Sequence, residues 1–160
     1  MAVREVLRYP HPALKRVAAE ATDDEAERVG ADLVDTMRSF PRCVGIAAPQ
    51  IGELVRVVVV DVTDHPKATT CHGLLVLANP RVVLASGSEV AREGCLSIPD
   101  LTANVRRATE IVVEAGSRVI RTEGFEARCL LHEIDHLDGL LFLDRVNSLK
   151  DDVFRRKRYA

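Results

Sequence analysis

His132, Glu133 and His136 form a His-Glu-x-x-His pattern in the segment LLHEIDHLDG, Leu130–Gly139. On a helix the two histidines lie one turn apart on the same face, so both imidazoles can reach one metal ion. Glu133 can then lie beside the metal without binding it, placed to take a proton from an attacking water. The alternative is an ordinary amphipathic helix whose histidines are satisfied by hydrogen bonds. The whole pattern favours a metal site and hydrolytic chemistry.

The pattern does not say which residue is the third metal ligand. Proteases with the longer pattern HExxHxxGxxH have a histidine after the glycine, and none follows Gly139 at that spacing. The acids further on are Asp144, Asp151 and Asp152, and too little chain follows for the second subdomain of a protease. Upstream, Cys95 lies in REGCLSIP, in a loop that leaves a strand, and its thiolate would suit Zn²⁺ or Fe²⁺. Taken alone, a single cysteine is more often a small buried apolar residue.

Three separated motifs occur in a fixed order along the chain. They are GIAAPQ (Gly45–Gln50), EGCLS (Glu93–Ser97) and HEIDHLDG (His132–Gly139), and the opening segment VLRYPHPALKRVA precedes them. With these motifs the chain resembles the peptide deformylase family over nearly its whole length. A single HExxH is only moderately specific, whereas the ordered set of three is very specific.

The resemblance implies a metal site and a reaction. The ligands would be Cys95, His132 and His136, which leave a fourth position open for water, as in catalytic sites. The metal would be one divalent ion, Fe²⁺ in most of the family, with Zn²⁺ or Ni²⁺ as substitutes. The implied reaction removes the N-formyl group from the initiator methionine of a nascent peptide and releases formate. Glu133 would be the general base.

The resemblance also assigns groups that would contact the substrate. The Gln50 side-chain amide and the Leu96 backbone N–H would stabilise the oxyanion of the tetrahedral intermediate. Gly45 would let the substrate backbone come close. Val44 and Cys129 would line the pocket for the methionine side chain. The alternatives are a solvated loop glutamine, a plain turn glycine and simple core packing.

Glu93 and Arg107 resemble a family ion pair that braces the Cys95 loop. The alternative is that each is an independent surface charge.

Three positions depart from the family pattern. Cys43 stands where the first motif usually begins with glycine, Leu131 replaces the usual glutamine before His132, and Thr102 stands near a position that often carries arginine or tyrosine. They leave other functions open: a specialised deformylase acting on another N-formyl substrate, or a weakly active or inactive metal-binding protein. A zinc endopeptidase is a further alternative, and it would need a third ligand other than Cys95.

The elements that must position these residues can be predicted in outline. Residues 22–40 read as an amphipathic helix, with Thr22 and Glu25 as a capping box and Pro41 after its end. Residues 43–52 read as a loop, 54–62 as a buried valine-rich strand, and 73–80 and 81–87 as further strands.

Towards the C-terminus, residues 110–124 read as a hairpin. The HExxH helix follows from Phe125 and stops at Gly139, and residues 140–146 read as a short strand. Strands in the middle with helices near both ends, without regular alternation, favour an α+β fold. We therefore predict antiparallel or mixed sheets around a central HExxH metal-binding helix, with an N-terminal amphipathic helix.

Composition limits the remaining functions. The 160 residues are 47% hydrophobic and 29% charged, which predicts one globular domain over residues 1–160. The formal net charge of −2 gives no basic field for DNA, and no apolar run is long enough for a membrane span. MAVREVLRYPHP does not have the pattern of a secretory signal, so we expect a cytoplasmic protein with reduced cysteines. The basic tail, Arg155–Arg158, would contact ribosomal RNA transiently or be a solvated end.

Overall fold

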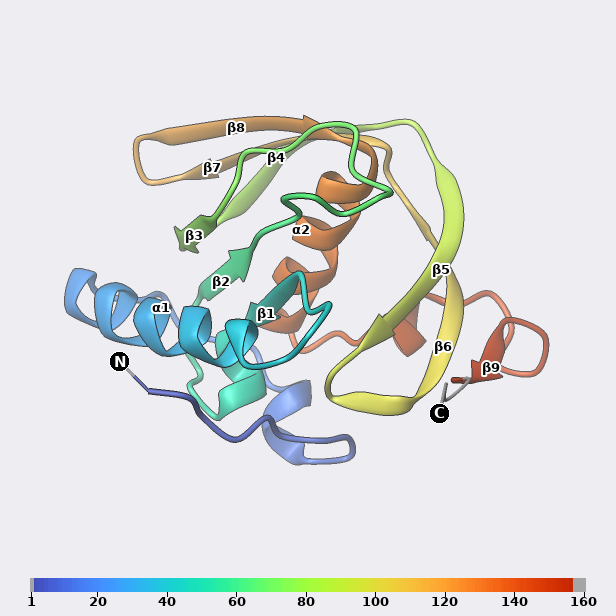
Figure 1. Cartoon of the computed structure of the whole chain (residues 1–160), viewed down its shortest axis with the longest axis horizontal. Helices are drawn as coiled ribbons and strands as arrows, with labels where there is room; N and C mark the ends of the chain where they lie inside the picture. Colours follow the sequence, from blue (N-terminus) through green and yellow to red (C-terminus); the bar gives the residue numbers. More distant parts are fainter. Residues whose placement is uncertain (1, 157–160) are drawn as a thin grey trace.

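The computed structural model describes residues 2–156, which form two α-helices, three short 3₁₀ helices and nine β-strands (Figure 1). The helices are α1 (Asp23–Arg38), α2 (Gly124–Leu137), η1 (Pro12–Lys15), η2 (Ala48–Ile51) and η3 (Phe142–Arg145). The strands are β1 (Gly45–Ala47), β2 (Val57–Val60), β3 (Leu75–Ala78), β4 (Arg81–Ser86), β5 (Glu89–Cys95), β6 (Ile98–Arg107), β7 (Glu110–Ala115), β8 (Arg118–Glu123) and β9 (Val153–Arg155). No helix within residues 2–156 is long and apolar enough to cross a bilayer.

The strands form three antiparallel sheets of three strands each within the described residues. Their orders are β1–β2–β3, β4–β7–β8 and β5–β6–β9. One isolated parallel bridge, between Ala19 and Val55, ties the segment before α1 to the segment before β2. The fold is therefore α+β, with antiparallel sheets and two α-helices.

Helix α1 forms where the capping box predicts it. The Thr22 side chain accepts a hydrogen bond from the Glu25 backbone N–H at 3.2 Å, and the Glu25 side chain accepts one from the Thr22 N–H at 3.0 Å. Val29, Leu33 and Met37 recur at helical spacing and are completely or almost completely buried. The helix thus presents one apolar stripe to the sheet β1–β2–β3.

Strand β2 is buried on both of its faces. Val57 and Val59 pack with the apolar stripe of α1, whereas Val58 and Val60 point to the other face and pack with residues of α2. Successive side chains alternate between faces, so a strand covered on both sides needs a continuous apolar run. This explains the four consecutive valines.

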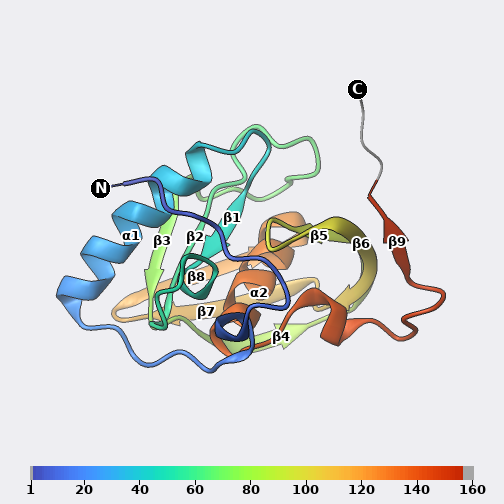
Figure 2. The ribbon, with the colours of Figure 1, turned by 90° about the horizontal axis from the view of Figure 1, so that it is seen from below.

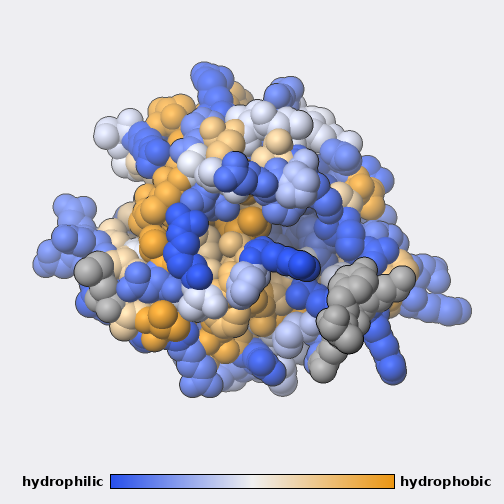
Figure 3. Space-filling model, in the orientation of Figure 1, coloured by the Kyte–Doolittle hydropathy of each residue, from blue (hydrophilic) through white to orange (hydrophobic). Residues whose placement is uncertain are grey.

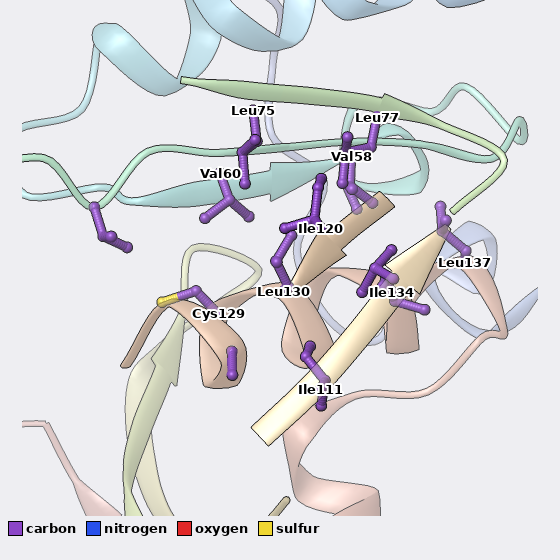
Figure 4. Close-up of a cluster of buried hydrophobic side chains, with 14 of the residues drawn as sticks. Val58, Val60, Leu75, Leu77, Ile111, Ile120, Cys129, Leu130, Ile134 and Leu137 are labelled. Atoms are coloured by element: carbon purple, nitrogen blue, oxygen red, sulfur yellow. The ribbon is translucent and has the colours of Figure 1, made fainter. Parts of the chain in front are cut away.

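Helix α2 lies between the sheets and is covered from several directions (Figures 1 and 2). Figure 4 shows Cys129, Leu130, Ile134 and Leu137 of α2 among buried residues of the surrounding strands. Those strand residues are Val58 and Val60 of β2, Leu75 and Leu77 of β3, Ile111 of β7 and Ile120 of β8. The opposite side of α2 faces β5 and β6, to which it is joined by polar contacts at the site.

Two predicted elements are wrong. The predicted loop at 43–52 contains β1, which pairs with β2, and η2, in which the Gln50 side chain accepts a hydrogen bond from the Ala47 N–H at 2.9 Å. The predicted strand at 140–146 is η3, because the Asp144 carboxylate accepts a hydrogen bond from the Leu141 N–H at 2.8 Å and closes a helical turn.

Candidate active site

Helix α2 holds His132, Glu133 and His136 in the interior, where each residue is at most 8% exposed. The chain turns away just after the helix at Gly139, whose φ is 73°. A Cβ at Gly139 would lie 2.6 Å from the Lys15 carbonyl oxygen, so only glycine fits this close approach. The turn thereby seats the end of α2 against the N-terminal segment.

Cys95 comes from the hairpin of β5 and β6, far from α2 in sequence. It is the last residue of β5 and pairs with Ile98, the first residue of β6, so that Leu96 and Ser97 form a tight turn. The pairing register shifts between Gly94 and Cys95. Such a bulge changes the direction of a side chain, and here the thiol of Cys95 is brought to α2.

Cys95, His132 and His136 converge, and their potential ligand atoms all lie within 4.8 Å of one another. The Cys95 Sγ is 3.5 Å from the His136 Nε2. His132 uses its Nδ1 to contact a Glu93 carboxylate oxygen at 2.8 Å, which leaves its Nε2 for a ligand. Two imidazole nitrogens and one thiolate sulfur are a donor set that fits Zn²⁺ or Fe²⁺.

Glu133 supplies a carboxylate beside this donor set. Its Oε1 is buried, lies 4.0 Å from the His136 Nε2 and has no hydrogen-bond partner in the described part of the chain. Burial disfavours the charged carboxylate and raises the pKa of Glu133 to about 7, although the charges of His132 and Arg107 oppose the shift. A buried carboxylate whose Oε1 accepts no hydrogen bond, with a pKa near neutrality, suits a general base.

The two histidines are in different electrostatic environments. Burial lowers the pKa of His136 well below its usual value, and the nearby His132 and Arg107 lower it further. Burial alone would also lower the pKa of His132, but Glu133, Cys95 and Glu93 together raise it well above its usual value. His136 is therefore held in the neutral form that binds metals.

Glu93 and Arg107 form a buried ion pair with two contacts, of 2.6 and 3.0 Å. Glu93 also accepts hydrogen bonds from Arg128 at 2.6 Å and contacts His132, while Arg107 donates to Asp135 at 2.9 Å. Burial opposes the charge on Glu93, but its bonds to His132 and Arg107 lower its pKa to about 2. The network ties the strand that carries Cys95 to the helix that carries the histidines.

Sequence reasoning missed Arg128, Asp135 and Arg145 in this network. Arg145 donates two hydrogen bonds to Asp135, at 2.9 and 3.0 Å, and so joins η3 to α2. Arg128 and Asp135 are four residues before and three after His132, which places them on the same helical face. That spacing was the signal that could have found them.

Gln50 is 1% exposed, and its amide is directed at the Cys95 hairpin. Its Nε2 donates to the Ser97 Oγ at 3.1 Å and contacts the Cys95 Sγ at 3.5 Å, while its Oε1 accepts from the Ala47 N–H. The side chain is thus fixed beside the donor set. Leu96, the other predicted oxyanion donor, lies in the hairpin turn and lines the same pocket.

The remaining predicted residues surround a pocket of about 310 Å³ that contains Cys95, His132 and Glu133. Gly45, Val44 and Cys129 line this pocket, and Val44 and Cys129 also pack against the core around α2. A Cβ on Gly45 would lie 2.8 Å from the Glu133 Oε2. The absence of a side chain at Gly45 therefore makes room for the Glu133 carboxylate.

The three departures from the family pattern have different surroundings. Cys43 lines the pocket, its thiol contacts the Gly45 carbonyl at 3.3 Å, and burial raises its pKa to about 11. Leu131 is half-buried against the core around α2. Thr102 lies on β6 opposite Gly94, and its hydroxyl accepts a hydrogen bond from Arg92 at 3.4 Å.

A pocket that brings two imidazoles, a thiol and a buried carboxylate together, on this α+β fold, has the features of a metal-dependent hydrolase. The family model for polypeptide deformylase matches residues 3–152. Peptide deformylase 2 of Vibrio cholerae is 40% identical over 163 residues, covering 98% of this chain and 94% of that protein. The chain belongs to the polypeptide deformylase family.

Solved structures agree with this assignment. A peptide deformylase from Legionella pneumophila has a TM-score of 0.81 at 37% identity, covering 93% of this chain and 89% of that chain. A peptide deformylase from Ehrlichia chaffeensis in complex with actinonin has a TM-score of 0.83 at 28% identity, covering 94% of this chain and 92% of that chain. The chain is a metal-binding hydrolase of protein biosynthesis that removes the formyl group from nascent peptides.

Proposed function

We propose that this chain acts on the initiator formyl-methionine of nascent peptides and releases formate, with the pocket around α2 as its active site. The observation that carries the proposal is the convergence of Cys95, His132 and His136 beside the Glu133 carboxylate, whose buried Oε1 accepts no hydrogen bond within the described residues. Three ligands leave one position open for a reactant, which is the arrangement of catalytic metal sites.

The metal ligands in this proposal are Cys95, His132 and His136. The central helix α2 supplies both histidines, and the N-terminal amphipathic helix α1 supports the sheet beside it. A bound divalent ion supplies Lewis acidity to the formyl carbonyl and the attacking water. Fe²⁺ is the proposed native ion, and the same donor set accepts Zn²⁺ or Ni²⁺. Glu93 and Arg107 hold His132 and the Cys95 hairpin in position.

Proton transfer in the proposed reaction is the task of Glu133. Its carboxylate takes a proton from the attacking water and gives it to the leaving amine of methionine. Gln50 and the Leu96 backbone N–H donate hydrogen bonds to the formyl oxygen as charge develops on it. The Gln50 amide suits this role because its other end is already fixed by the Ala47 N–H.

Gly45, Val44 and Cys129 form the proposed contacts with the substrate. All three line the pocket. In the proposal, Val44 and Cys129 form an apolar wall for the methionine side chain, and Gly45 lets the substrate backbone come close. Because the substrate is a nascent peptide, we place the reaction in the cytoplasm, with residues 1–160 acting as one catalytic domain. A transient ribosome contact through Arg155–Arg158 completes the proposal, although Lys157 and Arg158 lie outside the described residues.

The alternative functions lack a supporting observation. An endopeptidase would need a third metal ligand other than Cys95, yet the Cys95 thiol lies 3.5 Å from the His136 Nε2. An inactive metal-binding protein would not need a buried carboxylate oxygen of Glu133 without a hydrogen bond at the same place. The comparisons support the deformylase reaction and give no support to a different N-formyl substrate.

The decisive experiment measures formate release from formyl-Met-Ala and metal content on one anaerobic preparation. We expect activity with about one metal ion per chain. Cys95→Ala should lose both metal and activity, whereas Cys71→Ala, which changes an exposed thiol, should keep both. A fully metal-loaded wild type that releases no formate would overturn the proposal. Cys95→Ala that retains its metal would overturn the ligand assignment.

A further inference from the structure

Three exposed arginines border the pocket that contains Cys95 and Glu133. Arg42 comes from the turn between α1 and β1, Arg92 from β5, and Arg156 from the segment after β9. Figure 3 shows hydrophilic side chains around a hollow that lies between the positions of α2 and β5. Cationic side chains from three separate parts of the chain therefore meet at one opening.

These arginines are not neutralised by carboxylates of the described chain. Among the ion pairs of residues 2–156, which have a nitrogen–oxygen distance of at most 4.0 Å, none involves Arg42, Arg92 or Arg156. Arg92 instead donates to the Asn104 Oδ1 at 3.1 Å and lies over the Phe154 ring at 3.9 Å. Neutral partners hold Arg92 in place and leave its charge uncompensated.

Arg156 lies directly beside the Cys95 hairpin. Its guanidinium occupies the space next to Gly94, so that a Cβ on Gly94 would collide with it. The Arg156 backbone N–H donates to the Asp100 carbonyl at 2.9 Å, which anchors the residue on β6. The cation is thus held next to the predicted metal ligand.

Of the acids near the pocket, Glu93 is engaged in ion pairs and Glu133 is buried, whereas Asp64 shares an outer hollow with Arg42. Glu93 is occupied by Arg107, Arg128 and His132, and Glu133 is 5% exposed at the base of the pocket. On the outer side of Arg42, Asp61 is paired with Arg38 at 2.7 Å, and Asp64 lines the same outer hollow without an ion pair. Among the described residues that line the pocket with the three arginines, the acids are Glu93 and Glu133, and both are buried.

The entrance is therefore positive on a chain whose formal net charge is −2. A cluster of like charges at a concave opening attracts ligands of the opposite sign more strongly than one surface charge does. Guanidinium groups are well suited to carboxylates because they present paired donors.

We propose that Arg42, Arg92 and Arg156 select substrates that carry a carboxylate shortly after the formyl-methionine. This inference rests on the proposed function, because it places the formyl group at Glu133 and the metal ligands. The peptide then leads outward, and each residue advances it by roughly 3.3–3.6 Å. The residues that follow the formyl-methionine then pass the arginines. Their carboxylate is an Asp or Glu side chain, or the C-terminus of a very short peptide.

The test compares kcat/KM for formyl-Met-Glu-Glu-amide, formyl-Met-Gln-Gln-amide and formyl-Met-Lys-Lys-amide. Exposed ion pairs are individually weak, so we expect about a fivefold preference for the acidic over the lysine peptide at low salt. The preference should fall towards one at high ionic strength, because salt screens exposed charges. Formyl-Met-Ala with a free carboxylate, compared with its amide, separates the two sources of the carboxylate.

Variants assign the preference to the three arginines. The measured quantity is kcat/KM for the acidic peptide divided by kcat/KM for the lysine peptide. This ratio should fall in Arg42→Gln, Arg92→Gln and Arg156→Gln. It should be retained when the same arginines are replaced by lysine. Arg118→Gln, at an exposed arginine of β8 outside this pocket, is the matched control and should keep the wild-type ratio. Circular dichroism and metal content show that each variant is folded.

Binding is measured separately from activity. Fluorescence anisotropy of labelled acidic and lysine peptides on Glu133→Ala reports the charge preference without turnover. Two results overturn this inference alone. One is formate release at equal rates from the acidic and lysine peptides, and the other is a preference that survives in the triple glutamine variant. A wild type that releases formate from none of the peptides overturns the proposed function, and equal binding of the labelled peptides then overturns the charge preference as well.

Discussion

Glu93→Gln tests whether the buried ion network positions the active site. Glu93 accepts two contacts from Arg107 and one from Arg128, and it contacts His132, while only 7% of its surface is exposed. Glutamine keeps the shape but removes the charge and turns one acceptor oxygen into an amide donor facing a guanidinium. Breaking a buried pair by changing one partner costs about 3–5 kcal/mol. At roughly 2–4 °C per kcal/mol, the Tm should fall by about 6–20 °C.

The matched control is Glu114→Gln. Glu114 pairs with Arg81 at 3.1 Å, but the two side chains are 42% and 75% exposed, respectively. An exposed pair of this kind contributes below about 1 kcal/mol. The two substitutions make the same chemical change, so the difference between them measures the effect of burial.

The assay is urea and thermal unfolding of both metal-free variants, followed by titration with Zn²⁺. Because Glu93 orients the His132 ring, we also expect Glu93→Gln to bind metal about 10–100-fold more weakly. The reasoning is refuted if Glu93→Gln loses no more stability than Glu114→Gln. An unchanged metal affinity in a destabilised variant would limit the network to a structural role.

Three further predictions concern single positions. Gly45→Ala should displace the Glu133 carboxylate, because the added Cβ would lie 2.8 Å from its Oε2. We expect kcat to fall about 100-fold at unchanged metal content, and an unchanged kcat would contradict this. Iodoacetamide at neutral pH should label the exposed Cys71 before Cys43, because burial raises the pKa of Cys43 to about 11. Mass spectrometry measures the order of labelling, and faster labelling of Cys43 would contradict the burial argument. Thr22→Ala should cost about 1 kcal/mol in urea unfolding through loss of the α1 cap, with no loss of activity; no change in stability would contradict the role of the cap.

Local sequence patterns were sufficient for the elements whose stability is local. The helix over 22–40 follows from its capping box and apolar stripe, and α1 has that box and stripe. The predicted start at Phe125 and stop at Gly139 agree closely with α2, because a left-handed glycine ends it. The buried strand over 54–62 contains β2, and its valine run follows from burial on both faces.

Elements that depend on distant partners were not predictable in this way. Residues 88–109 are rich in charges and carry no strong strand pattern, yet they form the β5–β6 hairpin, inside which Glu93 and Arg107 are paired. Strand β9 forms by pairing with β6, so its charged sequence gives no signal of its own. The apolar run at 140–146 favoured a strand, but the Asp144 side chain closes a 3₁₀ turn instead.

The candidate site also contains residues that local sequence patterns predict and residues that come together only in the folded chain. The histidine spacing predicts a metal site by helix geometry alone. Cys95 was a candidate ligand from its own segment, but only the family resemblance favoured it over a small buried apolar residue. The arginines at the pocket entrance share no motif, because Arg42, Arg92 and Arg156 meet only in the folded chain. Gly45 was interpreted as a residue that admits the substrate backbone, and the structure adds that it makes room for Glu133.

The central claim is that Glu133 acts as the base beside a metal held by Cys95, His132 and His136. The most direct measurement is formate release from formyl-Met-Ala by wild type and Glu133→Ala, with metal content determined on the same samples. The account predicts that Glu133→Ala keeps its metal and loses nearly all activity. A metal-loaded Glu133→Ala variant with wild-type activity would contradict it.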